Sequence, residues 1–332
     1  MPTLSPKTKS NRARKSHNLY LGVDGGGTKT HIVLIDDEKN PICEGFSGAS
    51  NPLRVGVETA VANIIKALDA TCDKAQLSRG DVVSATLGLA GVRRADLRQR
   101  VHERFRNLLG IKKIEVVTDA EIALYGTTLG KAGVVVIAGT GSICYGKNEN
   151  GKFATAGGWG PIAGDEGGGS TIARRALQAI AKAIDGRGKP TKLSAAGIEY
   201  FRTSTPENLL IAIYSPQVDN ARIAGFARYV AEVAREGDEI AVEILKEAGF
   251  ELGLAAVAVI KKLNLERKKV PIGSVGSIFK AGRLLTDSLL KTVHQIAPKA
   301  FLAAPQLLPA RAGAEMAFEN FRNGTNRRAP AL

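Results

Sequence analysis

Short apolar runs separated by polar turns follow one another from residue 19 onward. Residues 19–24 form an apolar run that ends in Asp24, and three glycines with a Thr-Lys-Thr segment lead into a second run at 31–35. Glycine adopts positive φ and permits a tight connection, so we predict two antiparallel strands joined by a glycine turn. A polar turn at 36–40 then leads to a third predicted strand at 41–46.

The same pattern occurs a second time in the chain. An apolar run at 134–137 leads into Ala-Gly-Thr-Gly-Ser at 138–142, and a strand-like segment at 143–147 follows. A polar turn at 148–151 precedes another strand-like segment at 152–156. Duplication of a whole supersecondary unit is a much stronger signal than one glycine turn. It predicts two facing halves, each with its own glycine turn.

The rest of the pattern indicates an α/β fold of two domains. Length and an ordinary apolar fraction suit two domains of about 150 residues each. We expect a basic tail at 1–18, a first domain at 19–128, a second domain with a helical insertion at 129–309, a closing helix at 310–322 that packs on the first domain, and a flexible tail at 323–332. Helical periodicity covers 57–68, 97–109, 122–129, a stretch ending near 184, most of 194–263 with 239–262 the most periodic, a stretch from the 276–277 turn to 296, and 310–321; further strands are predicted at 81–89, 114–118, 270–275 and 301–304.

Charge changes this picture little. The net charge is +14, from 46 basic and 32 acidic residues, but five of the basic residues lie in 1–18 and three more in 322–328. Without those eight residues the net charge is +6, which does not amount to a nucleic-acid-binding face. We interpret the basic start as a disordered, solvated tail.

Other protein classes are disfavoured by what the chain lacks. Asp24 interrupts the apolar segment that a secretory signal would need, and the longest apolar run, 254–260, is too short to span a bilayer. We therefore expect a cytoplasmic protein without a membrane partner; the sequence leaves a homodimer open. Histidines and cysteines show no metal-ligand or disulfide spacing, the cysteines being Cys43, Cys72 and Cys144.

The glycine turns are candidates for binding phosphate. Bare backbone N–H groups approach an anion closely where no Cβ intervenes, and the hydroxyls of Thr28 and Thr30 add donors. Asp24 at the strand end is a candidate ligand for Mg²⁺, through water; the alternative is a carboxylate that only caps the turn. Neither the Walker pattern nor the dinucleotide fingerprint is present. A nucleotide across two such turns is the simplest interpretation.

Five motifs occur in a characteristic order: DGGGTKT, VTDAEIAL, AGTGS, GGWGPIAGDEGGG and GSVGS. Together they resemble the N-acetylglucosamine kinases and the wider BadF/BadG-type ATPases, which belong to the actin, heat-shock-protein and hexokinase superfold. The resemblance covers residues 19–321. It implies two ribonuclease-H-like domains, each with a mixed five-stranded sheet flanked by helices, with ATP and a sugar in the cleft between them.

Carried over residue by residue, the resemblance assigns two sets of ligand contacts. The expected ATP-binding residues are Gly25, Gly26, Gly27, Thr28, Lys29, Gly139, Thr140, Gly141, Ser142, Ala234, Gly276 and Ser277, the last three near the adenosine. The expected sugar-binding residues are Asn51, Asp119, Gly157, Gly158, Trp159 and Asp165.

Asp119 is the candidate catalytic residue. Phosphoryl transfer asks for positioning and charge stabilisation, and a carboxylate at the end of a strand can accept the proton of a primary sugar hydroxyl. The alternative is that Asp119 only caps the following helix. Asn51 could instead be only a turn residue before a proline. Trp159 could instead be a packing residue. The role of Glu166 stays open.

The motifs predict an ATP- and Mg²⁺-dependent kinase of an amino sugar, with N-acetylglucosamine at its 6-hydroxyl as the first choice. Glucosamine and N-acetylmuramic acid are close alternatives. Two other classes within the resemblance are an ATPase that activates 2-hydroxyacyl-CoA dehydratases or benzoyl-CoA reductases through an iron–sulfur cluster, and a non-catalytic sugar sensor. The dispersed cysteines disfavour the first, and the set of Asp24, both turns and Asp119 disfavours the second.

Overall fold

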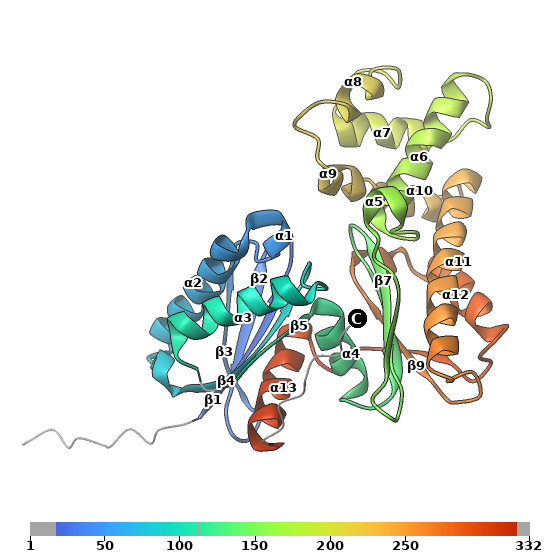
Figure 1. The fold of residues 1–332 in the computed structure, drawn as a ribbon. Helices are drawn as coiled ribbons and strands as arrows, with labels where there is room; N and C mark the ends of the chain where they lie inside the picture. The colour runs from blue at the N-terminus through green and yellow to red at the C-terminus, as the bar shows by residue number, and fades with distance from the viewer. Residues whose placement is uncertain (1–17, 112, 324–332) are drawn as a thin grey trace, which may run out of the picture.

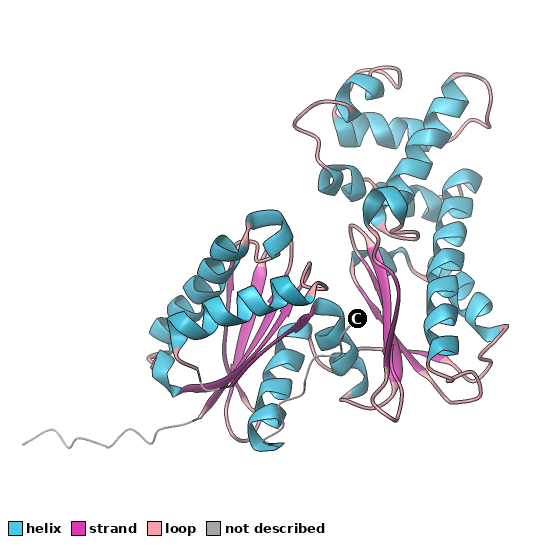
Figure 2. Cartoon of the chain, viewed as in Figure 1, coloured by secondary structure: helices cyan, strands magenta, loops and turns pink. Residues whose placement is uncertain are grey.

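The computed structural model describes residues 18–111 and 113–323 (Figure 1). The two predicted tails lie almost entirely outside these residues. Figure 2 shows two separate groups of strands, each flanked by helices. Among the described residues, no helix combines the length and apolar character that crossing a bilayer requires.

The first sheet has five strands in the order β3-β2-β1-β4-β5. β1 pairs antiparallel with β2 and parallel with β4, while β4 and β5 are also parallel. The hairpin register runs from Tyr20 opposite Ile35 to Gly25 opposite Thr30. The strands are β1 (Leu19–Gly25), β2 (Thr30–Ile35), β3 (Pro41–Ser47), β4 (Val82–Leu89) and β5 (Lys113–Thr118).

The second sheet repeats this arrangement. Its order, β10-β9-β6-β7-β8, is the first order read from the other edge, with antiparallel pairs at β6–β7–β8 and parallel pairs at β6–β9–β10. The predicted duplication is therefore confirmed as two mixed five-stranded sheets. The strands are β6 (Gly133–Ala138), β7 (Ser142–Lys147), β8 (Phe153–Gly157), β9 (Pro271–Val275) and β10 (Phe301–Ala303).

Helices cover both sheets and connect them. α2 and α3 pack on one face of the first sheet, α13 on the other, and α4 lies between the two sheets, where it packs on β6 and β7 (Figure 1). α11 and α12 cover the second sheet, and α6 to α10 extend from it. The helices are α1 (Pro52–Val55), α2 (Val57–Ala75), α3 (Ala95–Leu109), α4 (Asp119–Thr128), α5 (Gly160–Ala163), α6 (Gly169–Ile184), α7 (Leu193–Phe201), α8 (Leu209–Ile213), α9 (Asn220–Gly225), α10 (Ala227–Arg235), α11 (Glu239–Lys262), α12 (Arg283–His294) and α13 (Pro309–Asn323), with short 3₁₀ helices η1 (Arg79–Asp81) and η2 (Ser277–Ala281).

Two predicted helices have different boundaries in the structure. The helix predicted from the 276–277 turn to 296 is divided, because Gly282 adopts a φ of 84° between η2 and α12. The helix predicted at 122–129 begins earlier, at Asp119, because Thr118 and Glu121 form a capping box.

Strand β1 is the centre of the first sheet. Its successive side chains point to opposite faces of the sheet and so pack in two different hydrophobic cores. Leu21 and Val23 face α2 and α3, whereas Tyr20 faces α13. Gly22 also faces α13, so closely that a Cβ on it would lie 2.0 Å from the carbonyl oxygen of Ala310. The absence of a side chain at this one position lets the last helix return across the sheet.

We predict that Gly22→Ala destabilises the protein by about 3 kcal/mol or more, because the added methyl group meets helix backbone that cannot rotate away. Gly80→Ala is the matched control, since its Cβ would be 3.4 Å from the nearest atom, the Ser78 hydroxyl oxygen. Urea unfolding measures both. Equal stability of the two variants would contradict this packing.

Candidate functional site

The first glycine turn is fixed through its carbonyl groups. The carbonyl of Gly26 accepts hydrogen bonds from the N–H groups of Ser50 and Asn51, both at 3.1 Å. A trans peptide unit points its C=O and N–H in opposite directions, so the N–H of Gly27 points away from this support. No described residue accepts a hydrogen bond from it. The turn therefore presents an uncommitted donor.

The second glycine turn is fixed in the same way by the start of α6. The carbonyl of Gly139 accepts from the N–H of Gly169 at 2.8 Å, and that of Thr140 accepts from Ser170 N–H and Oγ at 2.9 and 2.8 Å. The N–H groups of Thr140 and Gly141 consequently point away from α6. Neither donates to another described residue. Two turns thus offer donors suited to the oxygens of an anion.

In each turn one hydroxyl group is buried and hydrogen-bonded to the protein, and another is exposed to solvent. Thr30 is fully buried, Ser142 is nearly so, and each donates to a main-chain carbonyl at 2.6 Å. Thr28 and Thr140 are exposed, and their hydroxyls have no hydrogen-bond partner among the described residues. Thr30 was expected to donate to phosphate, but its buried hydroxyl instead donates to the Gly48 carbonyl and holds the turn.

A short path of contacts joins the two turns across the molecule. Arg54 of α1 forms an ion pair of 3.0 Å with Asp219, which caps α9. A Cβ on Gly27 would lie 3.4 Å from the Arg54 guanidinium, and one on Gly169 would lie 3.1 Å from the carbonyl oxygen of Ala224 in α9. Because Gly169 supports the second turn, both turns lie beside the same junction between the two halves.

Two carboxylates stand at strand ends near the first turn. Asp24 lies in β1 and Asp119 begins α4 directly after β5, with β4 between the two strands. Burial raises the pKa of Asp24, opposed by the positive charges of His31 and Lys29. Burial, and then the charge of Asp24, raise the pKa of Asp119 to about 6. Two partly buried like charges make this a site that favours a cation.

Asp119 is not the cap of its helix. Thr118 occupies the cap position: its hydroxyl oxygen accepts from Glu121 N–H, while Glu121 accepts from Thr118 N–H at 2.7 Å. The Asp119 carboxylate accepts from the neighbouring Ala120 N–H at 3.0 Å and from its own backbone N–H. Of the two interpretations left open by the sequence, capping is therefore performed by Thr118, and most of the hydrogen-bonding capacity of Asp119 is uncommitted.

Asn51 does act as a helix cap, yet half of its amide stays available. Its Oδ1 accepts from Leu53 N–H at 3.0 Å at the start of α1. The same oxygen packs against Gly91 in the loop after β4, so closely that a Cβ on Gly91 would lie only 2.3 Å from it. This loop therefore supports the Asn51 side chain. No described residue accepts from its NH₂ group. The turn interpretation of Asn51 is thus correct for the oxygen and leaves the nitrogen as a donor.

Asp165 lies against the second glycine turn. It is 8% exposed, has a φ of 60°, and its Oδ1 accepts from Ser142 N–H at 3.3 Å. A Cβ on Gly141 would be 2.4 Å from its Oδ2. Burial raises its pKa, and the Ser142 hydrogen bond opposes the rise. Its contacts in this structure are therefore with the turn, and a contact with sugar stays a prediction.

Residues 157–159 face the first half of the molecule. Gly157 and Gly158 have φ values of 76° and 73°, and their carbonyls accept from Arg93 Nη1 at 3.4 and 3.1 Å. Trp159 is 72% exposed, so it is not the packing residue that the alternative interpretation required. Arg93 was not among the residues expected from the sequence. Its position just beyond a parallel strand, where ligands commonly bind in α/β sheets, was the available signal.

The residues expected near the adenosine gather beside the second turn. Gly276, with a φ of 114°, lies against the carbonyl of Ala138, which directly precedes that turn. Ser277 is exposed, whereas Ala234 is 3% exposed. α10 and η2 are joined by a hydrogen bond of 2.8 Å from Arg235 to the Lys280 carbonyl.

A metal ion at this site would have few protein ligands. The described residues contain no group of three or more His, Cys, Asp or Glu side chains placed to hold a metal. Asp24 and Asp119 nevertheless fit Mg²⁺, which prefers oxygen ligands and commonly uses one or two carboxylates together with phosphates and water.

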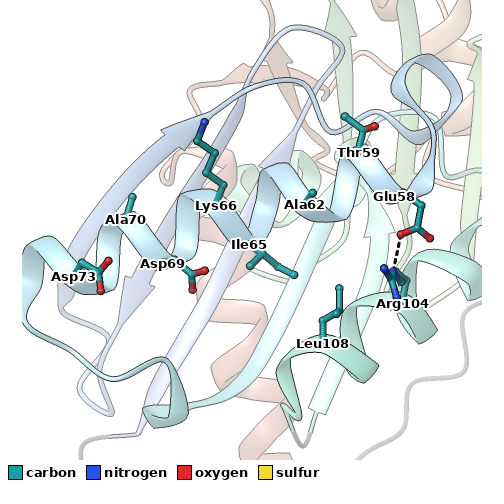
Figure 3. A pocket seen from close by; sticks show the side chains of 10 residues that line it. All are labelled: Glu58, Thr59, Ala62, Ile65, Lys66, Asp69, Ala70, Asp73, Arg104 and Leu108. Carbon is teal, nitrogen blue, oxygen red and sulfur yellow. Dashed lines mark hydrogen bonds and ion pairs between the residues drawn. The ribbon is translucent and has the colours of Figure 1, made fainter.

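A separate groove lies between α2 and α3, on their side away from the sheet. It contains Glu58, Lys66 and Asp69, and a 2.7 Å ion pair joins Glu58 to Arg104 across it (Figure 3). Neither glycine turn contributes to its lining. This groove is therefore separate from the candidate site at the two glycine turns.

Two similar mixed sheets, with paired glycine turns and strand-end carboxylates at their junction, define the class of two-domain actin-like ATPases and sugar kinases. The chain belongs to the BadF/BadG/BcrA/BcrD ATPase family, whose model matches residues 21–306.

Relatives of the chain include named sugar kinases. It is 35% identical to the N-acetylmuramic acid/N-acetylglucosamine kinase of Clostridium acetobutylicum, over 84% of this chain and 91% of that protein. It is 32% identical to the N-acetyl-D-glucosamine kinase of Dictyostelium discoideum, over 92% of this chain and 99% of that protein. The crystal structure of a predicted N-acetylglucosamine kinase from Chromobacterium violaceum superimposes with a TM-score of 0.74 at 28% identity, covering 91% of this chain and 99% of that one.

We predict that Asp119→Asn stabilises the metal-free protein at pH 7.5 by about 2 kcal/mol. A carboxyl group whose pKa is near 6 when folded and near 4 when unfolded opposes folding above pH 6, and this cost disappears below about pH 4. Urea unfolding in EDTA at pH 7.5 and pH 4 tests this. The control is Asp96→Asn, whose exposed carboxylate has a lowered pKa through Arg94 and should give no stabilisation. A pH-independent effect of Asp119→Asn would contradict the assignment.

Proposed function

We propose that the protein is an ATP-dependent kinase that transfers the γ-phosphate to the 6-hydroxyl of an amino sugar, N-acetylglucosamine being the first candidate. The observation that carries this proposal is the pair of glycine turns, whose carbonyls are bonded inward and whose N–H groups point outward beside one junction. The named relatives support the choice of an amino sugar over other phosphate acceptors.

The two turns hold the triphosphate from opposite sides. The N–H groups of Gly27, Thr140 and Gly141 donate to its oxygens, and the exposed hydroxyls of Thr28 and Thr140 add two more donors. Lys29 is also exposed and contributes positive charge. Gly276, with Ser277 and the backbone around Ala234, borders the adenosine. In this arrangement the protein contributes position and charge, which is what phosphoryl transfer requires.

Asp24 holds Mg²⁺, directly or through water. When bound with ATP, this ion neutralises charge on the phosphate oxygens. A cation held by Asp24 would also offset the unfavourable effect of the Asp24 charge on Asp119.

Asp119 accepts the proton of the sugar hydroxyl. With a pKa of about 6 the carboxylate is ionised at neutral pH, yet it is more basic than an ordinary aspartate. Both properties favour a general base. Asn51, through its free NH₂ group, and residues 157–159 orient the sugar, while Asp165 supports the site from the second turn.

We predict that Asp119→Asn lowers kcat by roughly 10²–10⁴ with N-acetylglucosamine, because the amide cannot accept the proton. ADP release with Mg-ATP is measured against N-acetylglucosamine, glucosamine, N-acetylmuramic acid, glucose and no sugar, with Asp96→Asn as the control. Near-normal turnover by Asp119→Asn would remove the role of Asp119. ADP release that no sugar stimulates would contradict the kinase itself.

A further inference from the structure

We infer that Arg93 forms a subsite for a carboxylate on the sugar, so that N-acetylmuramic acid, the 3-O-lactyl ether of N-acetylglucosamine, is a substrate. The inference rests on the proposed function and names its substrate more closely. It starts from the position of Arg93 in the loop after β4, the strand between those that end at Asp24 and Asp119. Gly91 of the same loop supports Asn51.

The guanidinium of Arg93 reaches the other half of the proposed sugar site. Its Nη1 donates to the carbonyls of Gly158 and Gly157, and its carbon lies 5.8 Å from the centre of the Trp159 ring. Arg93 therefore contacts one proposed sugar-binding segment and lies two residues from the support of another. A cation in this place is in reach of a substituent on the bound sugar.

The charge of Arg93 has no counterion among the described residues. Its neighbour Arg94 is paired with Asp96 at 2.7 Å, and Arg98 lies 4.0 Å from Glu121. Main-chain carbonyls orient the Arg93 guanidinium without neutralising it. A guanidinium carries five N–H donors, so Nε and Nη2 remain available. Such a planar pair of donors matches a carboxylate in a bidentate arrangement.

In N-acetylmuramic acid the carboxylate belongs to the lactyl group on O3. The hydroxyl that meets Asp119 is on C6, and the substituents of C2 and C3 project from the opposite side of a pyranose ring. A lactyl group on O3 therefore extends away from Asp119. Trp159, whose ring centre lies 5.8 Å from the guanidinium carbon of Arg93, is 72% exposed. N-acetylglucosamine uses the same site and leaves this cation to solvent.

The test compares Arg93→Met and Arg93→Gln with the adjacent Arg94→Met. The substrates are N-acetylmuramic acid, N-acetylglucosamine and 3-O-methyl-N-acetylglucosamine, which carries the ether without the carboxylate. Both Arg93 variants should lower kcat/KM for N-acetylmuramic acid by about 10- to 100-fold, as expected for loss of a hydrogen bond to a charged group. Because Arg93 also holds residues 157–158, the other two sugars should lose some activity as well, but at least about tenfold less than N-acetylmuramic acid, and Arg94→Met should change none.

Three results overturn the inference. Equal losses for all three sugars would make Arg93 only a link between residues 157–158 and the first sheet. Unchanged activity on N-acetylmuramic acid would remove the subsite. Rejection of N-acetylmuramic acid by the wild-type protein, with N-acetylglucosamine still phosphorylated, would refute this inference and leave the proposed function standing. Failure with every amino sugar would instead refute the proposed function.

Discussion

The site depends on one constraint, which is that the carbonyl groups of both glycine turns are bonded inward. The loop at 48–51 binds the first turn and the start of α6 binds the second. Because a planar trans peptide then directs its N–H outward, two unrelated supports produce the same donor arrangement. The first support comes from the backbone of a loop and the second from a helix N-terminus. The hydroxyls follow the same division, since the buried Thr30 and Ser142 hold the turns and the exposed Thr28 and Thr140 are left for a ligand.

Electrostatics adds a cost that a ligand can relieve. Asp24 and Asp119 are both partly buried, and the charge of Asp24 makes ionisation of Asp119 less favourable. Stability alone would favour a neutral group at position 119, and carboxylates with such raised pKa values are common at functional sites. The ion pair between Arg54 and Asp219 joins the halves beside the turns, and Arg93 provides a second link. These links place sites from two separate cores at one junction.

Much of the fold could be predicted, because it depends on local patterns. Apolar runs, glycine turns and the repeated order of elements indicated both sheets, and the structure confirms them. The turns and Asp119 could be named for the same reason. What the sequence could not supply were contacts between distant residues: Asp165 against Gly141, and Arg93 against residues 157–158. The cap at Thr118 was not foreseen, because an Asp beside a Thr offers two capping candidates and only backbone geometry decides between them.

The most direct test is a crystal structure with Mg²⁺, a non-hydrolysable ATP analogue and N-acetylglucosamine. The account predicts that the N–H groups of Gly27, Thr140 and Gly141 all donate to one triphosphate, with the Asp119 carboxylate in hydrogen-bond contact with the sugar 6-hydroxyl. A nucleotide bound by only one turn, or an Asp119 carboxylate remote from that hydroxyl, would contradict it.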